Sequence, residues 1–319
     1  MGYHHILYIR VTNQLGFISF HGTNTSRRPL LDTNTAIMKG IAIGGLNPVR
    51  IMGVINLSPE SFYKKSVVLD KDELQDRVRL IEKQGADIID IGGASTAPRE
   101  LYGTATINED EELSRVTSAM DIVSEITDLP ISVDTTSAVV AERALEMGAS
   151  AVNDVSGLRQ DAKMAGLVAD RHVPVVIMAI CPGGCSSVED SIRELSASIE
   201  TAEEAGIRRE NIILDPGIGF GKPAKVDFQI LRELHKYMLF ERPLLVGVSR
   251  KAFIGSLLEE PDPEDRLTGT IAATSVAVAN GADVIRAHDV TEAVIAARIG
   301  EALRSSQTTA GHNPPPSHG

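Results

Sequence analysis

Residues 50–56 read RIMGVIN, an apolar run that ends in a polar side chain, and this pattern recurs along the chain. Seven further apolar runs follow: ADIIDIGG (86–93), PISVD (130–134), SAVND (150–154), VPVVIMAI (173–180), IILD (212–215), LLVGVSRK (244–251) and DVIRAHD (283–289). A stretch with helical periodicity comes after each run, and capping residues mark many of the helix ends. This alternation predicts an α/β protein with parallel strands.

Two parallel architectures fit the alternation. An open, doubly wound sheet concentrates its chemistry at one switch point. A closed (β/α)8 TIM barrel collects polar residues from the carboxyl end of every strand. Because polar residues follow nearly every run, we predict the barrel, folded as a single domain.

The composition narrows the class of protein. The chain has 319 residues, 43% of them hydrophobic, and a net charge of −12, which argues against nucleic acid as a partner. No apolar run is long enough to span a bilayer, so no membrane role is expected. The two cysteines, Cys181 and Cys185, do not make a secreted disulfide framework, and neither metal partners nor a CxxC spacing accompanies them. A cytoplasmic protein is therefore expected.

The two ends differ from the middle. Residues 1–37 form an atypical extension that is polar over much of its length and lacks sustained periodicity, and residues 306–319 have the composition of a disordered tail. The barrel domain is expected over 38–305, with KGIAIGGLNP forming a hairpin before the first barrel strand. The physiological start is left open between Met1 and Met38.

The segment DPGIGFGK at 215–222 follows the sixth run. Its glycines would let the backbone approach a ligand, although a tight strand-to-helix loop explains them as well. The leading Asp215 suits a ligand that presents paired N–H donors, because a carboxylate accepts two hydrogen bonds in parallel.

Cations follow the last two runs. Ser249, Arg250 and Lys251 end the seventh, and Arg286 and His288 lie near the end of the eighth. Alternation along a strand sends Arg286 and His288 to the same side, where they could hold phosphate oxygens. Surface solubility and a structural ion pair with Asp289 are the plainer alternatives.

Asn56 ends the first run and opens a long loop. An asparagine carbonyl oxygen can ligate Mg²⁺, which needs few protein ligands when a diphosphate supplies the others. An asparagine at a strand end is also a common turn residue.

Seven segments together resemble the dihydropteroate synthases of the pterin-binding family, in the family's order. They are MGVINLSPESF (52–62), DIIDIGGASTAP (87–98), ISVDTT (131–136), AVNDVSG (151–157), ILDPGIGFGK (213–222), VGVSRKAFIG (246–255) and RLTGTIA with RAHDV (266–272, 286–290). The resemblance runs over most of residues 38–305. It implies a transferase that joins 6-hydroxymethyl-7,8-dihydropterin diphosphate to an arylamine, usually para-aminobenzoate, and releases pyrophosphate.

The resemblance also implies roles for individual residues. The pterin pocket would contain Asp134, Asn153, Met178, Asp215, Phe220, Gly247 and Lys251. The diphosphate would be held by Asn56, Thr96, Arg286 and His288, with Asn56 as the ligand of Mg²⁺. Ser249, Arg250 and Thr96 would lie beside the arylamine. Catalysis would fall to Asp134, Lys251, Arg286 and His288, and homodimers are common in the family.

Nothing in the sequence looks like a nucleophile with its own base. We therefore expect the diphosphate to leave early, with Mg²⁺, Arg286 and His288 stabilising the departing charge. The arylamine would attack the resonance-stabilised pterin cation that remains, and loops closing over the site would keep water out.

The chain departs from the family pattern in three loops. Ala97 stands where an arginine is common, the first loop carries Lys64 and Lys65, and the fifth run lacks a common histidine. Together with Arg99, the lysines would suit an arylamine that bears a sugar phosphate, as in methanopterin synthesis. On this hypothesis the chain resembles archaeal members of the family, and the pathway is either folate or methanopterin biosynthesis.

Two other functions fit parts of the sequence. A pterin-dependent methyltransferase that passes a methyl group to a corrinoid protein shares some segments, but it has no diphosphate to hold. A pterin-binding protein without catalytic activity would keep the pocket and lose the chemistry.

Overall fold

A computed structural model of the chain describes residues 34–59, 63, 67, 70–95, 107–181 and 183–310, with only the backbone described over 305–310. Predictions made for other residues, including the predicted site residue Thr96, fall outside these ranges.

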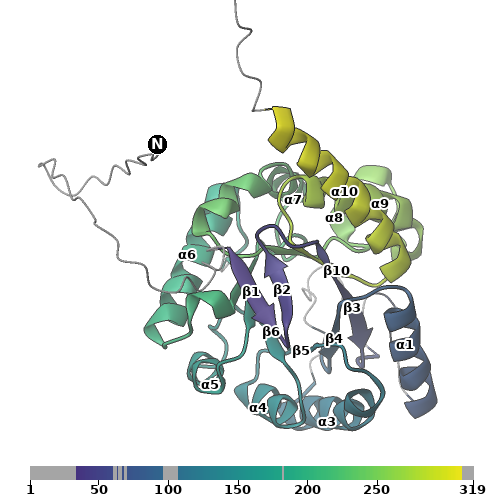
Figure 1. The fold of residues 1–319 in the computed structure, drawn as a ribbon, viewed down its shortest axis with the longest axis vertical. Coiled ribbons are helices and arrows are strands. Elements are labelled where there is room, and N and C mark those ends of the chain that lie inside the picture. Colours follow the sequence, from purple (N-terminus) through teal and green to yellow (C-terminus); the bar gives the residue numbers. More distant parts are fainter. Residues whose placement is uncertain are drawn as a thin grey trace, which may run out of the picture. The chain divides into compact units, whose positions relative to one another are not determined.

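Eight parallel strands form the centre of the fold (Figure 1). They run in the order β8-β7-β6-β5-β4-β3-β10-β9, and a parallel bridge between Leu214 and Leu244 joins the two ends of the sheet. The sheet therefore closes into the predicted barrel, and the open-sheet alternative is wrong. The strands are β3 (Arg50–Asn56), β4 (Ile88–Gly92), β5 (Ile131–Asp134), β6 (Ala151–Asp154), β7 (Val175–Met178), β8 (Ile212–Asp215), β9 (Leu245–Val246) and β10 (Val284–Ala287).

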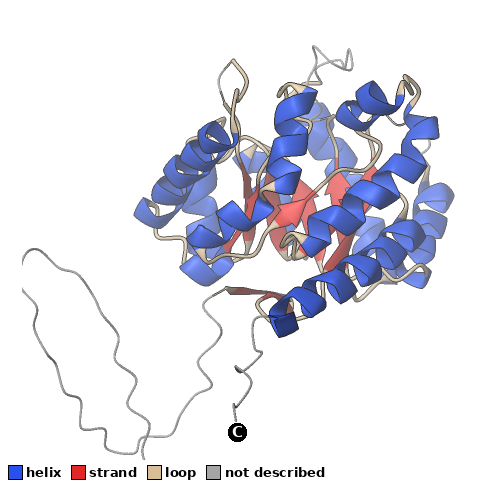
Figure 2. Cartoon of the chain, turned by 90° about the horizontal axis from the view of Figure 1, so that it is seen from above, coloured by secondary structure: helices blue, strands red, loops and turns tan. Residues whose placement is uncertain are grey.

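Helices surround the barrel, as Figure 2 shows. All eight stretches with predicted helical periodicity contain a helix. The helices are α1 (Lys71–Lys83), α3 (Glu109–Ile126), α4 (Ala138–Glu146), α5 (Met164–Arg171), α6 (Val188–Glu204), α7 (Ala224–Arg232), α8 (Ala252–Leu258), α9 (Leu267–Ala279) and α10 (Val290–Ala310), with short 3-10 helices η2 (Arg209–Asn211), η3 (Leu234–Phe240) and η4 (Pro263–Arg266).

Side-chain caps fix several helix starts where the sequence places Asp, Asn or Ser. Asp70 accepts a hydrogen bond from the Glu73 N–H at 2.8 Å, Asn108 from the Glu111 N–H at 2.8 Å, and Ser187 from the Asp190 N–H at 3.1 Å. Each cap satisfies a backbone donor that the first helical turn leaves unpaired. The helix predicted over 226–238 ends early, at Arg232, and continues as η3.

A hairpin of β1 (Thr35–Met38) and β2 (Ile41–Gly44) covers the amino-terminal end of the barrel (Figure 1). Its buried Ala36, Met38 and Ile43 pack against a layer of strand residues inside the barrel: Met52, Ile88, Ala151, Val176, Ile213, Leu245 and Val284. The hairpin begins before the boundary expected at residue 38, and α10 extends past the one expected at 305. None of the helices in the described ranges combines the length and apolar character needed to cross a bilayer.

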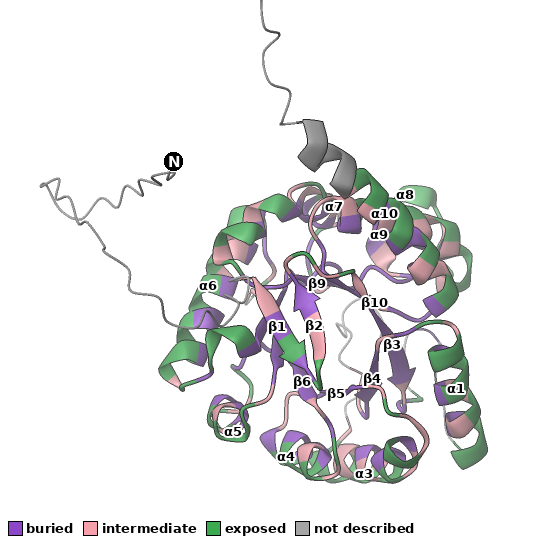
Figure 3. Ribbon diagram, viewed as in Figure 1, coloured by how far each residue is buried: buried purple, intermediate pink, exposed green. Residues whose placement is uncertain are grey.

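The strands are buried on both faces (Figure 3). Because side chains alternate along a strand, the residues next to the inner layer point outward and pack under the helices. Ile51, Ile89, Val152, Ile212 and Ile285 are examples, and they belong to one large apolar cluster shared with the helices. The cluster leaves little space at Gly53, where a Cβ atom would lie 2.6 Å from Ile81 Cγ2.

We expect Gly53→Ala to lower the free energy of unfolding by about 1–3 kcal/mol, because the core around Ile81 must shift to admit the methyl group. Gly166→Ala in α5 is the matched control, since nothing lies within 4 Å of its added Cβ. That control should be neutral or stabilising by about 1 kcal/mol. Urea unfolding followed by circular dichroism measures both variants, and equal effects would contradict the packing argument.

Candidate active site

A second layer of residues, most of them polar, lies inside the barrel next to the apolar layer, toward the carboxyl ends of the strands. On six strands this layer contains the residue two positions after the member of the apolar layer, and on β5 it contains the residue two positions after Ser132. Because side chains alternate along a strand, these seven residues lie on the inner side of the barrel, as the apolar layer does. These residues are Asp90, Asp134, Asn153, Met178, Asp215, Gly247 and Arg286. Six of the seven were predicted site residues, and the barrel brings them to one level.

Arg286 connects one half of this layer. Its Nε donates to Asp90 Oδ2 at 2.7 Å, and its Nη2 donates to Asp134 Oδ2 at 2.7 Å. Asn153 Nδ2 donates to the same Asp90 oxygen at 3.1 Å, while Asp90 Oδ1 has no hydrogen-bond partner in the described part of the chain. Asp90 was noted at a strand end in the sequence, but no role was predicted for it.

Burial raises the pKa of Asp134 to about 7, although the attraction of Arg286 opposes the shift. Burial acts to lower the pKa of Arg286, but Asp90 and Asp134 outweigh it, so the net direction is upward. The three groups therefore depend on one another, since each charge is compensated only by its neighbours.

Asp215 and Lys251 belong to the other half of the layer. Asp215 Oδ1 accepts the Gly217 N–H at 2.7 Å, and Lys251 Nζ donates to the Ile218 carbonyl at 2.5 Å. The ammonium lies 4.5 Å from the centre of the Phe220 ring. Burial lowers the pKa of Lys251 to about 8 and raises that of Asp215, and each group opposes the shift of the other.

Gly247 lies beside residues of both halves. A Cβ atom at this position would lie 3.7 Å from both Arg286 Cβ and Lys251 Nζ. An added methyl group would therefore be in van der Waals contact with both side chains.

Two buried charges order the loop after β8, and no role was predicted for either of them. Lys222 Nζ donates to the Gly217 carbonyl at 2.6 Å, and Asp227 Oδ1 accepts the Gly219 N–H at 2.8 Å. Burial raises the pKa of Asp227 to about 6. Asp227 lies inside the helical pattern of α7, where an acidic residue near the first turn looks like an ordinary favourable charge.

Ser249 and His288 meet at the end of the eighth strand. His288 Nδ1 lies 3.0 Å from Ser249 Oγ, which also accepts the His288 backbone N–H at 3.3 Å. Burial, followed by the charges of Arg286 and Arg77, holds the pKa of His288 well below 6.5. The imidazole is therefore neutral near pH 7.

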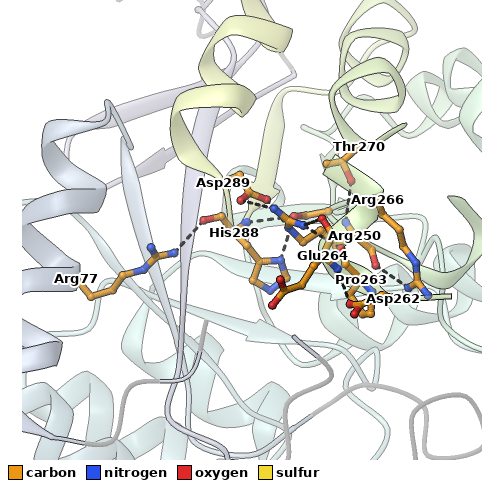
Figure 4. Close-up of polar contacts among 10 residues, drawn as sticks. Arg77, Arg250, Asp262, Pro263, Glu264, Arg266, Thr270, His288 and Asp289 are labelled. Carbon is orange, nitrogen blue, oxygen red and sulfur yellow. Dashed lines mark hydrogen bonds and ion pairs between the residues drawn. The ribbon is translucent and has the colours of Figure 1, made fainter. Parts of the chain in front are cut away.

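Arg250 differs from the expectation that it would lie beside an arylamine (Figure 4). It is buried, its Nε and Nη2 donate to Asp289 at 2.8 and 2.9 Å, and its Nη1 donates to the Pro263 and Glu264 carbonyls. The chain turns at Arg250, which has a positive φ of 56°, and its guanidinium is occupied by these contacts with residues of the following segments. The structural ion pair with Asp289 exists, but Arg250 makes it and Arg286 does not.

Asn56 ends β3, where it pairs in register with Gly92 of β4. Thr96 lies outside the described residues. Cys181 and Cys185 are joined by a disulfide that the sequence did not predict. Their Cα atoms are 5.1 Å apart, within the usual range for such a bond, because the chain turns at Gly183 and Gly184, both with positive φ.

The fold and site define a class: a closed (β/α)8 barrel whose mouth presents buried carboxylates, an amide and cations to a polar small molecule. Residues 52–288 match the sequence model of the family described as "Pterin binding enzyme". The chain belongs to this family.

Known proteins agree with this assignment. The chain is 39% identical over 252 residues to the dihydropteroate synthase of Clostridium beijerinckii, covering 78% of this chain and 92% of the relative. A crystal structure of the Clostridium difficile enzyme with pteroic acid has 40% identity and a TM-score of 0.73, covering 81% and 97% of the two chains. The Yersinia pestis enzyme in a sulfonamide complex has 33% identity and a TM-score of 0.77, covering 85% and 99%.

We expect Arg286→Met to lower the free energy of unfolding by about 3–5 kcal/mol, because it removes the cation that pairs with both Asp90 and Asp134, which are buried. The folded pKa of Asp134 is already raised from 3.8, so its contribution to stability falls as the pH rises toward 7. Loss of Arg286 raises this pKa further. The destabilisation should therefore be larger at pH 8 than at pH 5.

Urea unfolding of wild type and variant at both pH values measures the effect. Arg286→Met combined with Asp134→Asn should recover part of the loss at pH 8, since one of the two charges is gone. Equal losses at both pH values, with no recovery in the double variant, would contradict the proposed coupling.

Proposed function

We propose that the protein is a dihydropteroate synthase that condenses 6-hydroxymethyl-7,8-dihydropterin diphosphate with para-aminobenzoate in folate biosynthesis and releases pyrophosphate. The observation that carries the proposal is the divided layer inside the barrel mouth. Asp215 and Lys251 lie in one half, and Arg286 lies in the other with His288 two residues beyond it. Gly247, which has no side chain, lies beside Arg286 and Lys251. A substrate with a heterocycle at one end and a diphosphate at the other fits this division.

The pterin ring is assigned to the side of Asp215. The ring edge carries an amino group and a ring N–H, and a carboxylate accepts both. Asp215 Oδ1 already accepts the Gly217 N–H, which fixes the orientation of the carboxylate. Asn153 supplies an amide to the remaining edge, Lys251 a further donor, and Met178 and Phe220 apolar contacts to the ring faces.

The diphosphate is assigned to Arg286, His288 and Asn56. The Asn56 side chain offers an amide oxygen, and the described residues contain no cluster of three His, Cys, Asp or Glu side chains that would hold a metal by itself. These residues fit a Mg²⁺ ion that takes most of its ligands from the substrate and water. When bound, such an ion would neutralise part of the charge of the leaving diphosphate.

The chain's own residues then act by positioning and electrostatics. Arg286 is held between Asp90 and Asp134, so its planar group is fixed before substrate arrives. The neutral His288, oriented by Ser249, can donate one hydrogen bond to a phosphate oxygen. The C–O bond to the diphosphate breaks, and the arylamine nitrogen forms the new C–N bond to the pterin methylene carbon and loses a proton.

The arylamine is assigned to the rim near Ser249. Thr96, Lys64, Lys65 and Arg99 lie outside the described residues, so the hypothesis of a sugar-phosphate arylamine remains a prediction. The same holds for the homodimer expected from the family resemblance.

Pyrophosphate release tests the function directly. The purified protein is mixed with Mg²⁺, the dihydropterin diphosphate and para-aminobenzoate, and the expected products are 7,8-dihydropteroate and pyrophosphate. Tight binding of the diphosphate without turnover on any arylamine would favour a non-catalytic pterin-binding protein. Methyl transfer from a methyl-pterin to a corrinoid protein, with no pyrophosphate formed, would favour the methyltransferase.

We expect Asp215→Asn to weaken binding of the bare 6-hydroxymethyl-dihydropterin roughly 100-fold, because the amide replaces one acceptor by a donor facing the ring N–H groups. Isothermal titration calorimetry measures the change. Glu210→Gln in η2 is a control that neutralises an acid outside the site, and it should bind like wild type. Unchanged affinity of Asp215→Asn would contradict the assignment of the pterin ring to Asp215.

The second substrate is identified by separate assays with two arylamines. We expect kcat/KM for para-aminobenzoate to exceed that for its ribofuranosyl phosphate analogue, measured as pyrophosphate release at equal concentrations. The reverse order would support the sugar-phosphate hypothesis. Replacing both Lys64 and Lys65 by Ala should then reduce turnover of the analogue alone.

A further inference from the structure

Arg77 projects from α1 toward the carboxyl end of β10 (Figure 4). Its Nη2 donates to the His288 carbonyl at 2.9 Å, although 211 residues separate the two in sequence. The strand that precedes α1 is β3, which pairs with β10 through Met52 opposite Arg286 and Gly53 opposite Ala287. Arg77 therefore reaches the strand end that carries Arg286 and His288, two of the four predicted diphosphate residues.

The charge of Arg77 is not compensated by a carboxylate among the described residues. No ion pair within 4 Å involves it there, and its Nε is buried without a hydrogen-bond partner. Asp289 attracts it, but Arg250 already holds both oxygens of that carboxylate. A largely buried guanidinium with unused donors is costly unless an anion completes its surroundings.

Among the described residues, the two predicted diphosphate residues on β10 offer little net positive charge. Arg286 is bonded to two carboxylates, Asp90 and Asp134, so this cluster has no net positive charge to offer. His288 is neutral near pH 7, because burial and the surrounding cations lower its pKa. Neither residue alone matches the multiple negative charges of a diphosphate.

We propose that Arg77 is a further substrate-binding residue, which donates through its free guanidinium N–H groups to the diphosphate beside His288. This inference rests on the proposed function. Arg77 supplies the uncompensated cation that Arg286 and His288 lack, and its hydrogen bond to the His288 carbonyl fixes where the guanidinium lies. The planar fork suits phosphate oxygens, which accept in pairs.

The test compares three ligands by isothermal titration calorimetry: the dihydropterin diphosphate, the bare 6-hydroxymethyl-dihydropterin, and inorganic pyrophosphate with Mg²⁺. Arg77→Ala should weaken binding of the diphosphate and of pyrophosphate roughly 10- to 100-fold, the range for a charge-assisted hydrogen bond. Its affinity for the bare pterin should stay within about twofold, since no pterin contact is lost. Arg77→Lys should fall between wild type and Arg77→Ala, because it keeps the charge without the fork.

Arg79→Ala is the matched control on the same helix. The Arg79 side chain is 61% exposed and lies 3.7 Å from the exposed Asp76, so its loss should change none of the three affinities. A purely structural role of Arg77 as a cap on the His288 carbonyl predicts a different result. Arg77→Ala would then weaken all three ligands together or lower only the thermal stability, and either result would overturn the proposal.

The outcomes also separate this inference from the proposed function. If wild type binds the diphosphate and forms dihydropteroate while Arg77→Ala binds pyrophosphate equally well, only the role of Arg77 fails. If wild type binds neither the diphosphate nor pyrophosphate, both fail. Should Arg77→Ala not fold, Arg77→Gln and Arg77→Lys carry the same comparison.

Discussion

The ion pairs of Arg286 with Asp90 and Asp134 are the interaction on which the barrel interior depends. They connect β10 to β4 and β5, which are not neighbours of β10 in the sheet, and both carboxylates are buried. Removing charges from water is costly, so the arrangement persists only because each charge has its partner at 2.7 Å. The same ion pairs hold a planar cation at the barrel mouth in a fixed orientation.

The alternation of side chains explains how this layer coexists with a stable core. The apolar layer below it includes Ile88 and Val284, and Asp90 and Arg286 follow two residues later on the same strands. Apolar contacts stabilise the closed end of the barrel, and polar groups collect only where the strands open toward loops. The apolar layer that stabilises the fold and the polar layer are thus separated along each strand by about 7 Å, the length of two residues of extended chain.

Much of the fold and part of the site could be predicted from the sequence. The barrel followed from eight apolar runs with polar ends. Asp134, Asn153, Asp215 and Arg286 could be recognised at strand ends, and the barrel brings them to one level, while their binding roles remain predictions from the resemblance. What could not be predicted depends on pairing across the barrel. The partner of Asp289 proved to be Arg250, and Asp227 and Arg77 lie within ordinary helical patterns, where only the three-dimensional structure shows what they face. The disulfide was missed because spacing alone does not show how tightly a loop turns.

The hairpin of β1 and β2 bears on how substrates reach the interior of the barrel. Ala36, Met38 and Ile43 are buried at the amino-terminal end of the barrel, so among the described residues this end is filled by apolar side chains. A molecule resting on the level of Asp215 lies deeper than one held near Ser249, four residues beyond the apolar layer on β9. On the proposed function, the pterin would therefore bind before the arylamine and would be held in place by it.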